Sequence, residues 1–74
     1  MRLSQARAKR LLTVRDLARQ SGVSESNIHH VEYGDWLPSL ATVRKLVSVL
    51  EIEAEEVSEF KAAIQKAGKS KKLR

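Results

Sequence analysis

The feature that most constrains this chain is a pair of short amphipathic segments joined by a glycine, within residues 13–33. The first predicted helix begins at Thr13, whose hydroxyl can cap it together with an aspartate three residues later. It ends near Gly22, because glycine adopts the left-handed conformation of a helix end without steric cost. The second begins at Ser24, another capping residue, and places an isoleucine and a valine three residues apart on one apolar face. This spacing predicts two short helices on a tight turn.

Two short capped helices on a glycine turn indicate a helix-turn-helix, a motif whose second helix usually enters the major groove of DNA. The surrounding residues occur at the spacing that this motif requires. They are a small residue where the helices would cross, the turn glycine, two core residues, and then Glu-x-Gly and Pro-Ser. These residues are Ala18, Gly22, Ile28, Val31, Glu32, Gly34, Pro38 and Ser39. At these positions the chain resembles the Cro/repressor-type (XRE-type) helix-turn-helix family of small bacterial and phage transcriptional regulators, roughly over residues 3–57.

The resemblance implies an all-α, compact five-helix DNA-binding domain with the helix-turn-helix at helices two and three. Helical spacing of apolar residues supports further helices on either side of the motif, the last over about residues 54–67. We expect Gly68 to end that helix. The sequence therefore predicts one domain over residues 1–67 and a basic, disordered tail over residues 68–74.

Charge is divided unevenly along the 74 residues. Residues 1–45 hold eight Lys or Arg and four Asp or Glu, residues 46–67 hold two and five, and residues 68–74 hold four and none. A basic front, an acidic middle and a basic tail favour a protein that faces a polyanion with one side. So short a chain forms one small core, and without cysteine neither a disulfide nor a thiolate zinc site stabilises it.

Other function classes fit the sequence poorly. No apolar run approaches the ~20 residues of a membrane span, and the first residues do not begin a signal peptide, so we expect a cytoplasmic protein. Paired carboxylates, a nucleophile with its base and a phosphate-cradling glycine loop are all missing, so we expect neither an enzyme nor a cofactor. His29 and His30 are adjacent and point apart on a helix, so we expect no metal site.

We expect DNA contacts on the second motif helix and at two helix starts. The residues of that helix that do not face the core, with its cap, are Ser24, Glu25, Ser26, Asn27, His29 and His30. The resemblance implies that Glu25, Ser26 and His30 reach base edges; the alternative for each is an ordinary exposed side chain. Asn27 can reach a base or a phosphate. Amides at helix starts lack intrahelical partners, so we expect phosphate binding at Thr13, Val14, Ser39 and Leu40.

The resemblance also implies an internal ion pair between Arg7 and Glu32, joining the first helix to the end of the third. The alternative is two solvated charges. Leu11 stands where the family commonly has glycine, so it must adopt a strained left-handed conformation or distort the turn, and we expect a slightly different connection between the first two helices.

Large apolar residues outside the motif predict a homodimer interface. Trp36 and Leu37 lie on a predicted loop, where they either cover the core or form an interface, and we favour the interface. The apolar stripe of the last helix either caps the monomer core or pairs with a second copy. We assign Phe60 and Ile64 of that stripe to the same interface.

These features predict a sequence-specific regulator of transcription that binds double-stranded DNA, most simply a repressor, and acts as a homodimer on a pseudo-palindromic operator. The alternative is an interaction protein, such as an antitoxin whose last helix binds a toxin and whose DNA binding is autoregulatory.

Overall fold

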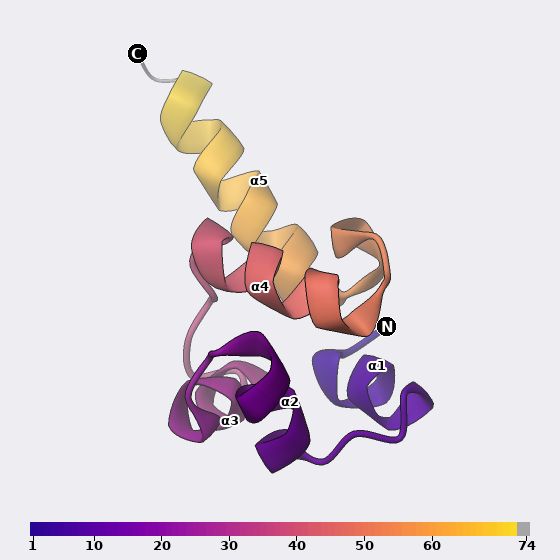
Figure 1. Ribbon diagram of the computed structural model, residues 1–74. Helices are drawn as coiled ribbons and strands as arrows, with labels where there is room; N and C mark the ends of the chain where they lie inside the picture. Colours follow the sequence, from indigo (N-terminus) through magenta and orange to yellow (C-terminus); the bar gives the residue numbers. More distant parts are fainter. Residues whose placement is uncertain (73–74) are drawn as a thin grey trace.

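The computed structural model describes residues 1–72, with side chains up to residue 67. Within this range the chain forms five α-helices and one 3₁₀-helix and contains no strand, which confirms the predicted all-α class. The elements are α1 (Leu3–Lys9), α2 (Val14–Ser21), α3 (Glu25–Tyr33), α4 (Leu40–Leu50), η1 (Ala54–Glu56) and α5 (Ser58–Lys72) (Figure 1). None of these helices is both long enough and apolar enough to cross a membrane. Helices α2 and α3 form the predicted helix-turn-helix.

Hydroxyl side chains begin three of the helices. At α2 the Thr13 hydroxyl accepts from the Asp16 amide at 3.0 Å, and the Asp16 carboxylate accepts from the Thr13 amide at 3.1 Å. Ser24 and Ser39 each accept a backbone N–H three residues on, both at 3.1 Å, and so cap α3 and α4. Each cap contributes about 1 kcal/mol, so local sequence determines where these helices begin.

Four connections after helices use a left-handed residue. Gly22 and Gly34 have φ values of 80° and 85°, as the glycine turns predict. Leu11 and Glu51 adopt φ values of 58° and 56° despite their side chains. After α1 the Leu11 amide donates to the Ala8 carbonyl at 2.9 Å. Leu11 therefore takes the strained left-handed conformation that a glycine would adopt there without strain.

The core lies between the helix-turn-helix and the layer formed by α4 and α5. Its buried apolar side chains are Leu3, Ala6, Leu17, Val23, Ile28, Val31, Val43, Leu46, Leu50, Val57, Phe60 and Ala63. Phe60 is fully enclosed by its own chain. Its assignment to a dimer interface is therefore wrong, because a ring that fills the monomer core cannot contact a second copy.

The last predicted helix, over about residues 54–67, begins later in the structure. The chain first forms η1 and then an extended residue, Val57, with φ −105° and ψ 124°. Helix α5 begins at Ser58, whose amide donates to the carbonyl of Met1 at 2.6 Å. The start of the chain therefore holds the start of α5 in place.

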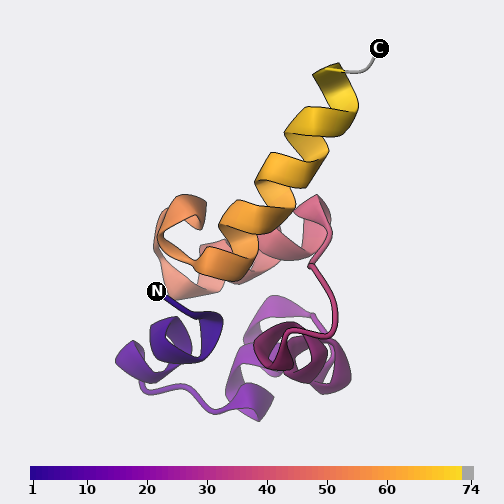
Figure 2. The same ribbon diagram turned by 180° about the vertical axis from the view of Figure 1, so that it is seen from behind.

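Helix α5 also runs further than the sequence predicts. It passes through Gly68 and ends at Lys72, so the prediction that Gly68 ends the helix is wrong. The predicted disordered tail is helical up to that lysine, and Leu73 and Arg74 lie outside the described residues. Figures 1 and 2 show α5 extending beyond the other helices, with its C-terminal end far from α2 and α3.

Candidate nucleic-acid interface

Helix α3 has one buried face and one accessible face. Ile28 and Val31 are completely buried, which fixes the rotation of α3 against α1, α2 and the core. The accessible side holds the predicted DNA-contacting residues, exposed or half-buried: Glu25, Ser26, Asn27, His29 and His30. The structure therefore brings these residues together on one surface.

Arg15 of α2 lies beside the start of that surface. Its Nε is 3.8 Å from Oε2 of Glu25, and both side chains are at least half exposed. Arg15, Arg19 and Glu25 also line a shallow groove next to the turn at Gly22. Sequence reasoning missed Arg15 and Arg19, although their spacing of four residues places them on one side of α2.

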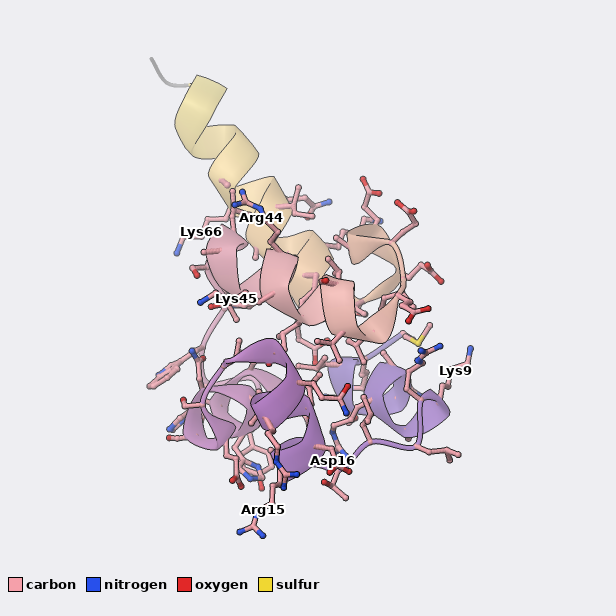
Figure 3. All side chains as sticks on the ribbon, viewed as in Figure 1. Lys9, Arg15, Asp16, Arg44, Lys45 and Lys66 are labelled. Carbon is pink, nitrogen blue, oxygen red and sulfur yellow. The ribbon has the colours of Figure 1, made fainter. Side chains whose placement is uncertain are left out.

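Helix α3 itself contains no Lys or Arg. The basic side chains that can approach phosphate therefore come from other elements. In Figure 3 Arg15 projects from the α2 and α3 end of the molecule, whereas Arg44, Lys45 and Lys66 lie beside α4 and α5. Within the part of the chain described with side chains, Arg44, Lys45 and Lys66 form no ion pair.

The turn after α3 folds back onto His30. The Nδ1 atom of His30 is 3.1 Å from Oδ2 of Asp35. The His30 ring stacks on the indole of Trp36, with 4.0 Å between ring centroids and 18° between planes. Trp36 was predicted to cover the core or, as we favoured, to form an interface, and this contact with His30 was missed. The signal was Gly34, which reverses the chain and returns the next two residues to the helix end.

Two helix starts offer backbone amides to an anion. Among the described residues, the amides of Val14 and Leu40 have no protein acceptor. The two starts differ in charge, because the first turn of α2 contains Asp16 and that of α4 contains no acid. Hydrogen bonds with Thr13 lower the pKa of Asp16, and the charge of Arg19 lowers it further. Its carboxylate competes with a phosphate at α2, so the start of α4 is the better anion site.

A partly buried ion pair holds the other side of α3. Arg7 donates from Nε to Oε2 of Glu32 at 2.8 Å, and its terminal amino groups donate to Oε1 of Glu32 at 3.1 Å and to the Leu12 carbonyl at 3.0 Å. The side chains are 20% and 8% exposed. The hydrogen bonds to Glu32 raise the pKa of Arg7, so the guanidinium stays charged. The pair ties α1 to the last turn of α3.

An apolar surface follows α3 and continues into α4. Its exposed members are Tyr33, Trp36, Leu37 and Leu40. Of the residues predicted for a dimer interface, Trp36 and Leu37 lie on this surface and Ile64 is half-buried on α5. With Phe60 in the core, the structure brings only part of the predicted set to the surface.

Comparison with known proteins gives one match. The model of a family described as a helix-turn-helix domain matches residues 1–60. No curated protein and no solved structure matches the chain. The family match ends in the first turn of α5, so the greater part of that helix lies beyond it.

Proposed function

Because the chain belongs to the helix-turn-helix domain family, whose members are DNA-binding regulators, we propose that it is a Cro/repressor-type (XRE-type) regulator of transcription. It binds double-stranded DNA in the cytoplasm as a homodimer, is most simply a repressor, and acts by binding rather than by catalysis. The observation that carries this proposal is the accessible face of α3, held in a fixed rotation by Ile28 and Val31.

Base edges are read from that face. Glu25 accepts a hydrogen bond from an amino group of a base, Ser26 donates or accepts, and His30 reads a third position. Asn27 and His29 contact the neighbouring base or phosphate. Ser24, the N-cap of α3, lies at the end of that helix which enters the major groove. The exposure of Glu25 and Ser26 supports these roles.

Phosphates on either side are bound by helix starts. Ser39 and Leu40 provide the stronger site, since no acid lies in the first turn of α4. Thr13 and Val14 provide the weaker site because Asp16 lies beside them. The long side chain of Arg15 adds a cation that reaches beyond the helix start.

The dimer forms through the apolar surface after α3. Trp36 and Leu37 are each about half exposed, at 51% and 48%. Large apolar side chains that remain this exposed in a small domain are typical of interaction sites. Ile64 of α5 extends the same interface.

Selection of bound sites from random duplex DNA tests the proposal. We expect two related half-sites whose centres are one helical turn apart, roughly 34–36 Å. Ser26→Ala should cost about 1–3 kcal/mol on the selected site and little on random DNA. Ser48→Ala, an exposed substitution of the same kind in α4, is the matched control and should change neither. No enriched sequence would refute specific binding, whereas equal losses on both kinds of DNA would make Ser26 a contact to the DNA backbone and not to a base.

One observation favours a second candidate, an antitoxin-like interaction protein. Helix α5 continues twelve residues beyond the matched region and extends away from α2 and α3 (Figure 2). An extended helix of this kind suits the groove of a partner protein. Truncation after Ala67 should then leave the selected DNA sequence unchanged and abolish binding to the product of a neighbouring gene. If the full chain does not bind that product, this candidate is removed.

A further inference from the structure

The side chain and the backbone of His30 are both held by the turn after α3. Its carbonyl accepts from the amides of Asp35 at 2.9 Å and Trp36 at 3.4 Å. The side chains of the same two residues contact its ring, at Nδ1 and on one ring face. Two consecutive residues thus fix where the ring lies and which way its plane turns.

The contact with Asp35 determines which ring nitrogen carries the proton. An ionised carboxylate offers only acceptor oxygens, so Nδ1 must be the donor in this 3.1 Å contact. A neutral imidazole has one N–H, and its other nitrogen is then an acceptor. The neutral ring therefore presents Nε2 as a lone pair. No other protein group in the described residues forms a hydrogen bond with the ring.

This reverses the chemistry expected of a histidine that reads DNA. A ring with its proton on Nε2 would donate to N7 or O6 of guanine, which are acceptors in the major groove. A ring with a lone pair on Nε2 instead needs a donor. The donors in the major groove are the exocyclic amino groups, N6 of adenine and N4 of cytosine.

We propose that Asp35 and Trp36 are positioning residues that hold His30 as a hydrogen-bond acceptor, so that the base it reads carries an exocyclic amino group. This inference rests on the proposed DNA binding and deepens it. Asp35 sets the tautomer, and Trp36 sets the plane of the ring through stacking. The side chain of His30 is 39% exposed, which leaves part of the ring accessible to a base.

The tautomer can be measured without DNA. In ¹⁵N-labelled protein at about pH 8, where an ordinary imidazole is neutral, long-range proton–nitrogen spectra distinguish the two ring nitrogens. We expect the proton of His30 on Nδ1 in the wild type and in Asp35→Glu, and largely on Nε2 in Asp35→Ala. His29, which stacks on Tyr33 and forms no ion pair with any side chain the structure describes, is an internal control that should not change. A proton on Nε2 in the wild type would overturn the inference.

The base preference is measured on the selected operator. All four base pairs are placed in turn at the position where His30→Ala abolishes the preference of the wild type. We expect adenine or cytosine to be preferred on the strand facing His30, and Asp35→Ala to reduce that preference about tenfold. Loss of the Asp35 charge tightens binding to all four base pairs alike, so the ratio between them is unaffected by charge. If adenine is preferred, replacing it with purine, which lacks the amino group, should cost as much as a mismatch.

A double-mutant comparison of Asp35 and His30 distinguishes positioning of the His30 ring from a general effect on the structure. In a His30→Ala background, Asp35→Ala should change no base preference, because the residue through which it acts is gone. Trp36→Leu should keep the proton on Nδ1 but weaken the preference by freeing the ring. Because Trp36 also lies in the proposed dimer interface, this preference is measured at concentrations where sedimentation shows the variant to be a dimer. An unchanged preference in Asp35→Ala would overturn the inference while the selected operator still stands. If the wild-type protein enriches no sequence from random duplex DNA, the proposed function itself is refuted, whatever the variants do.

Discussion

Two residues in the last turn of α3, His30 and Glu32, each pair with a side chain from outside the helix, and the two pairs differ in nearly every respect. Glu32 accepts two hydrogen bonds from Arg7, and these side chains are 8% and 20% exposed. His30 makes one 3.1 Å contact with Asp35, and these side chains are 39% and 57% exposed. Residues two apart on a helix face in nearly opposite directions, so one pair faces inward and the other faces solvent.

The difference indicates that burial, more than charge, decides what such a pair does. A desolvated pair is costly to break, because the remaining charge has neither water nor a partner. An exposed pair is screened by water and contributes little to stability. The inner pair can therefore hold α1 against α3, whereas the outer pair can orient a side chain for recognition without a large change in the free energy of unfolding.

The largest expected effect is on the inner pair. Glu32→Ala leaves the partly buried Arg7 guanidinium without its carboxylate and should lower the free energy of unfolding by about 3 kcal/mol. In a domain of this size the melting temperature should fall by more than about 10 °C. Thermal unfolding followed by circular dichroism measures it.

The matched control for this experiment is Arg10→Ala. Arg10 is 3.2 Å from Glu51, but the two side chains are 44% and 68% exposed. Its loss should cost less than about 1 kcal/mol. If both variants melt within a degree or two of the wild type, the contrast between buried and exposed pairs is wrong for this protein.

The second effect concerns the strained residue beside the inner pair. Leu11 is 90% exposed, so Leu11→Gly loses almost no packing. Glycine removes the left-handed strain at φ 58° but gives the unfolded chain more freedom, so we expect a net stabilisation of about 0.5–1 kcal/mol. Denaturant unfolding measures it. Leu11→Ala keeps the Cβ atom and should give no gain, and an equal gain from alanine would show that the leucine side chain, not the backbone, is the cause.

The helix starts and the glycine turns could be predicted from the sequence because their partners lie three or four residues away. The hydroxyl caps of Thr13, Ser24 and Ser39 are formed as predicted. The inward face of α3 also followed from the spacing of Ile28 and Val31. These features depend on local geometry, which a single sequence specifies.

The errors came where the outcome depends on distant parts of the chain. Periodicity shows that Phe60 belongs to an apolar stripe, but not whether its own core or a second copy covers it. Gly68 costs a helix only about 1 kcal/mol, so it favours a helix end without enforcing one. The contacts of Asp35 and Trp36 with His30 depend on how the turn at Gly34 folds back, which spacing alone does not reveal.

A smaller effect comes from an exposed carboxylate with backbone partners. Hydrogen bonds with Thr13 lower the pKa of Asp16 below its ordinary value. When folding lowers the pKa of a carboxyl group, its ionised form stabilises the folded state at pH values above the unfolded-state pKa, near 3.9. This stabilisation is lost as the pH falls through the folded-state pKa. Asp16→Asn should therefore melt below the wild type at neutral pH, and the two melting temperatures should converge in acid. A constant difference between them at every pH would contradict this linkage.

The smallest expected effect is on the outer pair, and it tests the comparison most directly. Asp35→Ala removes the carboxylate that contacts Nδ1 of His30, yet the free energy of unfolding should change by less than about 0.5 kcal/mol. The backbone bonds from the turn to the His30 carbonyl remain, because they do not use the side chain of residue 35. Denaturant unfolding of Asp35→Ala beside Glu32→Ala measures both pairs under one set of conditions. A loss of 2 kcal/mol or more from Asp35→Ala, on the order of a buried network, would mean that the outer pair also supports the fold. Its effect on base preference could then no longer be separated from an effect on α3 as a whole.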